Sequence, residues 1–79
     1  FRLRPNVFIE VKGKLDVESR HKYIWVKEQH PEIQLYLLFA KADNKLSKNS
    51  KTTYADWAEK NGFEWADIRR GIPKHWLKS

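Results

Sequence analysis

Two strand-like segments on either side of a helix-length segment constrain the fold of this 79-residue chain most strongly. Residues 33–39 are apolar at every position except Gln34, and residues 7–12 alternate between apolar side chains and a face that carries two charges. A strand that is apolar on both faces belongs in the middle of a sheet. A strand–helix–strand unit with a crossover of this length implies a parallel pair with a right-handed connection. The sequence therefore predicts an α/β fold.

The segment between these strands has clear helix boundaries. Asp16 is the predicted N-cap, and Pro31 ends the helix near residue 29 because it pushes His30 out of helical geometry. We expect Val17 and Ile24 to share a packed face. The neighbouring face is basic and aromatic, formed by Arg20, Tyr23 and Lys27. It would suit a phosphate backbone, although a plain surface helix fits this pattern equally well.

The remaining segments are shorter. Residues 2–5 read as the end of a strand or turn, and residues 40–52 as a polar, lysine-rich loop. Thr53 and Asp56 predict a capping box that opens a short helix, which Gly62 ends. Further on we expect a short strand at residues 63–65, a basic turn at residues 69–71, and a final helix that starts at Pro73 and carries Trp76.

Composition limits the class of protein. The high aromatic content favours a folded chain, and 79 residues allow one small domain at most. No apolar run approaches the length of a membrane span, and the absence of cysteine excludes disulfides and thiolate metal sites and suits a reducing cytoplasm. The chain contains no methionine and begins with Phe1, so we expect a processed chain or a fragment.

The net charge of +6 is unevenly distributed. Residues 1–14 and 41–51 each carry +3 and residues 69–79 carry +4, whereas the intervening stretches are acidic on balance. Separate basic patches suit a polyanion better than a uniformly positive surface does. The other interpretation is that these lysines keep a small protein soluble.

Glu10 and Lys12 carry the chemistry in the first strand. They project from the same face, with Cα atoms roughly 6.5–7 Å apart by strand rise, so one metal-bound phosphate could touch both. Burying such charges is costly unless they are paired or hold a metal. The alternative is an edge strand with a solvated polar face, on which Lys12 guards against aggregation.

Hydrolysis of a phosphodiester needs an activated water, neutralised phosphate charge and a stabilised leaving oxygen. Mg²⁺ held by carboxylates meets these needs, with Mn²⁺ able to take its place, and a neighbouring lysine can steady the growing charge. One glutamate cannot hold such an ion alone, so a partner carboxylate is expected from the sheet just before this strand. The three histidines lack the spacing of a zinc site, and no glycine-rich phosphate loop is present.

Several motifs together resemble the phage-type endodeoxyribonuclease I family, whose members resolve four-way (Holliday) DNA junctions. The first is Phe1-x-x-x-Pro5-Asn6-x-Phe8-x-Glu10-x-Lys12-Gly13, followed by the run from Glu28 to Glu32. Further matches are Thr53-Tyr54, Glu59-Lys60-x-Gly62, residues 63–67 and Ile72-Pro73-x-x-Trp76. The resemblance covers nearly the whole chain.

The resemblance implies roles for individual residues. Glu10 matches the metal-binding glutamate, Val11 the residue whose backbone carbonyl also reaches the metal, and Lys12 the catalytic lysine. Phe1 matches the phenylalanine of a Pro-Asp-Phe motif, so the metal-binding aspartate would stand immediately before it. A further catalytic glutamate of the family, on an upstream helix, has no counterpart here.

The resemblance also implies an architecture. It is a restriction-endonuclease-like core, a mixed sheet flanked by helices, within an intertwined homodimer. Residues 1–79 would form the C-terminal part of a single nuclease domain, with no second domain and with the N-terminal part missing. By itself such a segment is expected to be inactive. A phage protein of this kind would act in the cytoplasm of its bacterial host.

The expected function is therefore Mg²⁺-dependent, structure-selective cleavage of branched DNA. Contacts to backbone phosphates are predicted for the basic residues Arg20, Lys27, Lys41, Lys45, Lys48, Lys51, Arg69 and Arg70. Two rivals come from other classes. One is a DNA-binding module that keeps the fold without catalysis, and the other is a protein-interaction domain with negligible affinity for nucleic acid.

Overall fold

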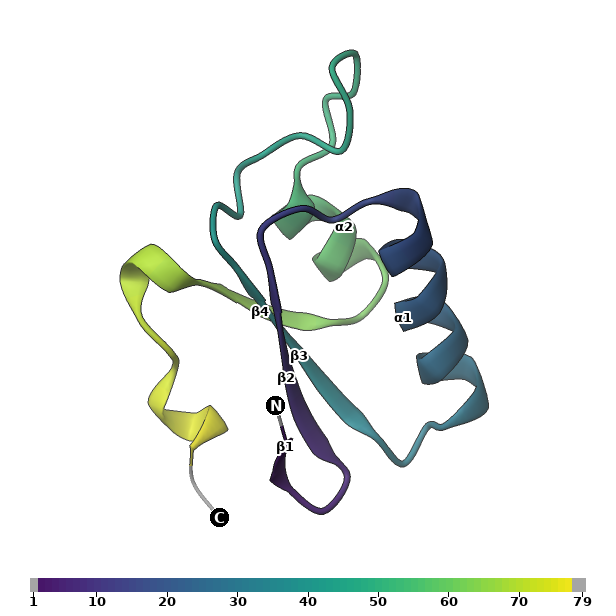
Figure 1. The fold of residues 1–79 in the computed structure, drawn as a ribbon, viewed down its shortest axis with the longest axis vertical. Coiled ribbons are helices and arrows are strands. Elements are labelled where there is room, and N and C mark those ends of the chain that lie inside the picture. Colours follow the sequence, from purple (N-terminus) through teal and green to yellow (C-terminus); the bar gives the residue numbers. More distant parts are fainter. Residues whose placement is uncertain (1, 78–79) are drawn as a thin grey trace.

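The computed structural model describes residues 2–77, so Phe1, Lys78 and Ser79 lie outside the described residues. Four strands form one sheet in the order β1-β2-β3-β4, in which β1 runs antiparallel to β2 and the other pairs are parallel (Figure 1). The strands are β1 (Arg2–Arg4), β2 (Val7–Lys12), β3 (Gln34–Phe39) and β4 (Glu64–Asp67). The helices are α1 (Val17–Gln29) and α2 (Tyr54–Lys60), followed by two 3-10 turns, η1 (Ile68–Arg70) and η2 (Lys74–Trp76).

The sheet confirms the main topological predictions. β3 lies between β2 and β4, as expected for a strand that is apolar on both faces, and it pairs in parallel with β2. The antiparallel β1 makes the sheet mixed. The turn between β1 and β2 passes through Asn6, whose φ of 65° lies in the left-handed region that asparagine tolerates. The last strand begins one residue later than predicted and extends to Asp67.

Helix α1 has the predicted ends but a different packed face. The Asp16 carboxylate accepts a hydrogen bond from the Ser19 backbone N–H at 2.8 Å, which caps the first turn. Tyr23, which we assigned to the basic-aromatic face, is only 2% exposed, whereas Val17 is 53% exposed. Ile24 packs against the core as predicted. The prediction was wrong for Val17 and Tyr23, because the buried phenol ring removes far more apolar surface from water than a valine in the first turn can.

Helix α2 begins at the predicted capping box. The Asp56 backbone N–H donates to the Thr53 hydroxyl and the Thr53 backbone N–H donates to the Asp56 carboxylate, both at 3.1 Å. The helix ends at Lys60, two residues before the predicted stop Gly62, whose φ of 77° suits glycine, and it buries Tyr54, Trp57 and Ala58.

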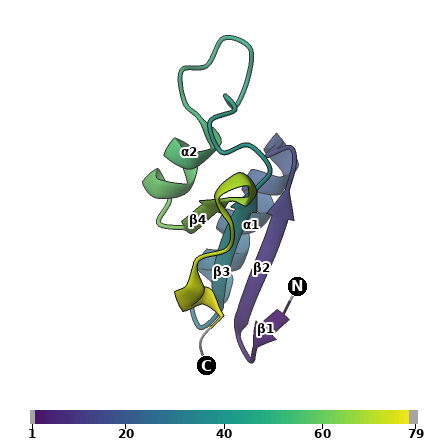
Figure 2. The same ribbon diagram turned by 90° about the vertical axis from the view of Figure 1, so that its left-hand side faces the viewer.

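The two faces of the sheet have different covers. Helices α1 and α2 pack on one face, against a core cluster centred on Leu37 and Phe39. The C-terminal segment covers the other face, where Trp76 is fully buried and stacks on Tyr36 with ring centroids 4.4 Å apart (Figure 2). The Glu64 carboxylate accepts hydrogen bonds from the rings of His75 and Trp76. Burial opposes ionisation of Glu64, but these bonds outweigh it and lower its pKa.

Neither helix in the described part of the chain is long and apolar enough to cross a membrane.

Candidate functional site

Glu10 and Lys12 project from the helix-covered face of β2. In the parallel register Glu10 stands beside Leu37 and Lys12 beside Phe39, and both of these β3 residues are fully buried in the cluster beneath α1 and α2. Residues in the same row of adjacent strands share a face. Glu10 and Lys12 are each half-buried, so they are neither sealed from solvent nor on opposite faces. The structure places the acidic and the cationic side chain on one face, as predicted, and their roles in metal binding and catalysis stay predictions.

A shallow pocket opens beside Glu10. Its volume is about 190 Å³, and Phe8, Glu10, Lys22 and Tyr23 are among its lining residues. Burial, and then the neighbouring Glu10 carboxylate, raise the pKa of the Tyr23 phenol above its usual value. The carboxylate therefore has a protonated phenol as a close neighbour and an open route to solvent.

Lys12 lies where β2 ends and the chain turns into α1. Hydrogen bonds from Ser19 are the main reason that the pKa of the Asp16 cap is lowered, and the charges of Lys12 and Lys14 lower it further. The ammonium group of Lys12 thus stands near the start of α1, on the same side of the sheet as Glu10.

The backbone of β2 shows where the Val11 carbonyl points. The carbonyls of Asn6 and Lys12 accept hydrogen bonds from Gln34 and Ala40, at 2.7 and 3.0 Å, so the even-numbered carbonyls of β2 face β3. Because backbone groups alternate along a strand, the Val11 carbonyl faces the β1 side. The last described β1 pair is Arg2 with Phe8, so this carbonyl lies beyond it, next to Glu10.

These oxygens match a hard divalent ion in kind but not in number. Mg²⁺ binds carboxylate, carbonyl and water oxygens. Of these, Glu10 offers a carboxylate and Val11 a backbone carbonyl. Among residues 2–77 no group of three or more acidic or histidine side chains could hold a metal ion. Glu10 and Val11 would therefore be only part of the ligand set that such an ion needs, and a site here would require at least one further carboxylate from elsewhere.

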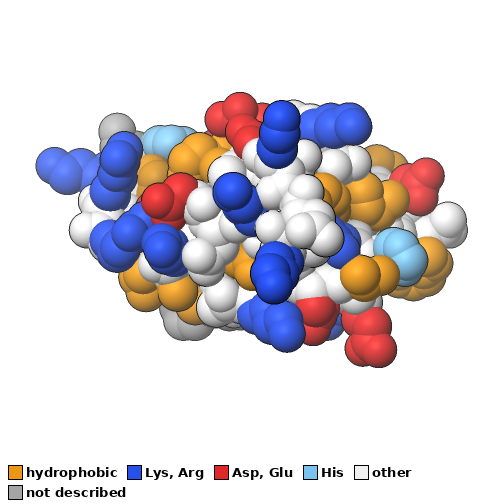
Figure 3. Space-filling model, turned by 90° about the horizontal axis from the view of Figure 1, so that it is seen from above, with side chains coloured by type: hydrophobic (Ala, Val, Ile, Leu, Met, Phe, Trp, Pro, Cys, Tyr) orange, Lys and Arg blue, Asp and Glu red, His pale blue; other side chains and the backbone are white. Residues whose placement is uncertain are grey.

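The sheet brings most of the predicted basic residues to one end. Lys12, Phe39 and Asp67 stand in one row across β2, β3 and β4 at the carboxyl ends of these strands. The loop that follows β3 projects from this end, and η1 follows β4 (Figures 1 and 2). Figure 3, viewed onto this end, shows Lys and Arg side chains spread among fewer acidic ones. The exposed basic residues that these two segments carry are Lys41, Lys45, Lys48, Lys51, Arg69 and Arg70.

The two residues of α1 that are predicted to contact DNA are placed differently. Arg20 is half-buried in the first half of the helix, which starts from the carboxyl end of β2. Lys27 is in the last turn, where its ammonium group donates to the Gly62 carbonyl at 2.9 Å and lies 4.9 Å from the centre of the Phe63 ring. Gly62 precedes β4, so Lys27 lies at the opposite end of the sheet from the lysine-rich loop. Its predicted DNA contact stays a prediction.

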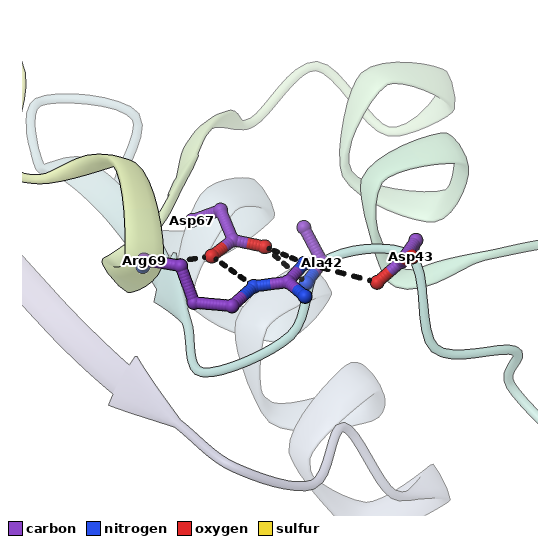
Figure 4. Close-up of polar contacts among 4 residues, drawn as sticks. All are labelled: Ala42, Asp43, Asp67 and Arg69. Atoms are coloured by element: carbon purple, nitrogen blue, oxygen red, sulfur yellow. Dashed lines mark hydrogen bonds and ion pairs between the residues drawn. The ribbon is translucent and has the colours of Figure 1, made fainter.

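A buried carboxylate fixes the root of the lysine-rich loop, and the sequence did not reveal it. Asp67, 5% exposed, accepts hydrogen bonds from the Ala42 backbone N–H at 2.9 Å and from Arg69 Nε and Nη2 at 2.9 and 2.6 Å (Figure 4). Arg69 Nη2 also reaches Asp43 at 3.1 Å. The Arg69 side chain, and then the Ala42 N–H, hold the pKa of Asp67 far below its usual range.

Part of the Arg69 charge is therefore matched within the protein. Its guanidinium bridges Asp67 and Asp43, so it orders the end of β4 against the loop that leaves β3. The Asp67-x-Arg69 spacing was the only sequence signal for this contact, and such a spacing is common on protein surfaces. The predicted phosphate contacts of Arg69 and Arg70 stay predictions.

Comparison with known proteins places the chain. A family model described as phage endonuclease I matches residues 1–79. Endonuclease I of Escherichia phage T7 is 37% identical over 78 residues, which are 99% of this chain and 51% of that protein. Endodeoxyribonuclease 1 of Enterobacteria phage T3 is 43% identical over 67 residues, 85% of this chain and 44% of that protein. The chain thus spans about half the length of these relatives, and it belongs to the phage endonuclease I family.

Proposed function

We propose that this chain is part of a Mg²⁺-dependent, structure-selective endonuclease that hydrolyses phosphodiester bonds in branched DNA and resolves four-way (Holliday) junctions. The observation that carries the proposal is the position of Glu10 and Lys12. They share one solvent-accessible face near the carboxyl ends of the parallel strands, the end where the basic loop and η1 also lie. The printed names of the T7 and T3 relatives, an endonuclease and an endodeoxyribonuclease, support a DNA endonuclease.

The roles of the site residues follow from their chemistry. The Glu10 carboxylate and the Val11 carbonyl would hold the divalent ion, which when bound supplies an activated water and neutralises phosphate charge. Lys12 carries a point charge two residues from Glu10 on the same face. It would orient the attacking water and stabilise the charge that develops on the phosphate.

The β1–β2 register suggests where the missing carboxylate belongs. Arg2 pairs with Phe8 in an antiparallel ladder. In such a ladder the residue two positions before Arg2 pairs with the residue two positions after Phe8, which is Glu10. In a longer chain whose β1 keeps this register, the residue immediately before Phe1 would stand opposite Glu10 on the same face. We propose that this residue is an aspartate and that it completes the metal site. We propose equally that the sheet is part of a restriction-endonuclease-like core in an intertwined homodimer.

Cleavage of matched substrates tests the proposal. The full-length protein is expected to cut a four-way junction and not a linear duplex of the same sequence, and to lose this activity when EDTA removes Mg²⁺. Residues 1–79 alone should not cut either substrate, because they hold only part of the metal site. Junction binding by the full-length protein without any cleavage in Mg²⁺ or Mn²⁺ would contradict the nuclease proposal.

That outcome would favour a DNA-binding module that keeps the fold. One observation supports this second candidate for the chain itself, since no complete metal-binding group exists among residues 2–77. A protein without measurable affinity for either DNA at physiological salt would exclude both candidates and leave a protein-interaction role.

Salt dependence tests the proposed DNA-binding end separately. If Lys41, Lys45, Lys48 and Lys51 each neutralise one phosphate, released counterions give a log–log slope of about −3.6 from these residues alone. That slope lowers junction affinity roughly 100-fold between about 50 and about 200 mM salt. Replacing all four lysines with glutamine should remove this part of the slope in a binding titration.

The matched control for the salt titration is Lys60→Gln. Lys60 is an exposed lysine that ends α2, close to the start of β4 and away from the loop. This variant should leave the slope of the wild-type protein unchanged. An unaltered slope in the fourfold variant would exclude the lysine-rich loop as the phosphate contact.

A further inference from the structure

The Tyr23 hydroxyl is a buried polar atom without a regular partner. The residue is 2% exposed and its ring packs edge-on against Phe63, with centroids 6.5 Å apart. Its hydroxyl oxygen is buried and makes no hydrogen bond of regular geometry to any of the described residues. Buried polar atoms in native proteins are nearly always paired. A phenylalanine would fill the same space without this cost, so the hydroxyl calls for an explanation.

The groups around this hydroxyl suggest one. Tyr23 and Glu10 line the same pocket, and the Glu10 carboxylate lies close enough to help raise the pKa of the phenol, after burial as the main cause. Ser19, one turn earlier and also buried, and the Asp16 cap are its other close polar neighbours. A protonated phenol is a donor, and a carboxylate accepts through both oxygens. Carboxylates that bind metals are commonly held by such a second hydrogen bond.

We infer that Tyr23 is a positioning residue for Glu10, its phenolic O–H donating to the Glu10 carboxylate in the metal-bound protein and fixing the oxygen that faces the ion. This inference rests on the proposed function. It assigns to α1 a task beyond covering the sheet, because the helix carries the donor that orients a side chain of β2. It also explains why a tyrosine rather than a phenylalanine occupies this core position.

Tyr23→Phe in the full-length protein tests the inference, with metal affinity as the main readout. Titration with Mn²⁺ in a calorimeter should show affinity about tenfold weaker than in the wild type, the usual lower limit for loss of an outer hydrogen bond. Thermal unfolding in EDTA should show equal or higher stability, since no regular hydrogen bond is lost without metal. Unchanged Mn²⁺ affinity, or weaker affinity together with a lower unfolding temperature in EDTA, would overturn the inference.

Two matched controls and one double variant sharpen the test. Tyr36→Phe removes a phenolic hydroxyl from the opposite face of the sheet, and Ser19→Ala removes the other hydroxyl beside Tyr23. Both should keep wild-type Mn²⁺ affinity. In a Glu10→Gln background, Tyr23→Phe should weaken Mn²⁺ binding no further, because its effect runs through Glu10. A further loss in that background would mean that Tyr23 acts by another route.

The outcome for the wild type separates this inference from the proposed function. Wild-type protein that binds Mn²⁺ and cuts junctions, with Tyr23→Phe indistinguishable from it, refutes only the role of Tyr23. Wild-type protein that binds no divalent ion refutes both.

Discussion

Replacing Lys12 with alanine in the full-length protein is expected to slow junction cleavage by at least about 100-fold while junction affinity stays within about twofold of the wild type. Lys12 is half-buried, two residues from Glu10 on the same face of β2. In the proposed role, an ammonium group there would stabilise charge that grows only as the phosphodiester bond breaks. Its removal should therefore raise the barrier without weakening the ground-state complex, which gel-shift titration and single-turnover cleavage measure separately.

Lys14→Ala is the matched control for Lys12. It removes the same charge two residues further along, from an exposed position beyond the end of β2. Lys14→Ala should reduce cleavage only as much as it reduces junction binding, and both effects should be small. Equal losses of binding and cleavage in Lys12→Ala would assign Lys12 to DNA binding and refute its catalytic role.

The order of elements could be predicted from local signals. The double-sided apolar pattern of residues 33–39 predicted the central strand, the Asp16 cap and Pro31 set the ends of α1, and the capping box of Thr53 and Asp56 opened α2. Each signal acts over a few residues, through backbone geometry or one hydrogen bond. Such signals do not depend on the rest of the chain.

The packing of α1 depended on more distant residues and could not be predicted. The helix has no clean apolar stripe, so its sequence alone does not say which side faces the sheet. The edge-on contact with Phe63 and the burial of the Tyr23 ring select the Tyr23 side. For the same reason the link between Asp67 and Ala42 was invisible, since the two residues are 25 positions apart and meet only when β4 pairs with β3.

The site was predictable as far as one strand defines it. Period-two alternation places Glu10 and Lys12 on one face, and it also sends the Val11 carbonyl toward the β1 side. The number of metal ligands could not be obtained in this way, because a metal site gathers groups from several elements. The lysine-rich loop and η1 likewise lie at one end of the sheet only because β3 and β4, the strands that precede them, run parallel.

Replacing Asp67 with asparagine is expected to lower the unfolding temperature of the full-length protein by on the order of 5 °C. The carboxylate accepts hydrogen bonds from Arg69 and from the Ala42 backbone N–H, and it is 5% exposed. Asparagine has the same size, but an NH₂ donor replaces one of the two carboxylate oxygens. That donor would face the Arg69 guanidinium or the Ala42 N–H group, which are themselves donors. Thermal unfolding measures the loss, and faster hydrogen exchange at the Ala42 amide would locate it at the root of the loop.

Asp43→Asn is the matched control for Asp67. Asp43 touches the same Arg69 Nη2 at 3.1 Å, but its side chain is 68% exposed. An exposed ion pair contributes little to stability, so this variant should unfold within about 1 °C of the wild type. Equal losses in both variants would mean that the Arg69 charge, rather than the buried carboxylate, holds the loop. If the loop grips DNA as proposed, only Asp67→Asn should also weaken junction binding.

The lowered pKa of Asp67 predicts how the difference in unfolding temperature between the wild type and Asp67→Asn depends on pH. Because Arg69 and the Ala42 N–H stabilise the carboxylate, its folded-state pKa lies below the ordinary value of 3.8. A carboxyl group shifted in this direction stabilises the fold fully above the unfolded pKa, and that contribution is lost as the pH falls through the folded pKa. The difference in unfolding temperature between wild type and Asp67→Asn should therefore be constant from about pH 7 to about pH 5 and shrink below about pH 4. A difference that grew on acidification would show that the carboxylate is not held by these donors.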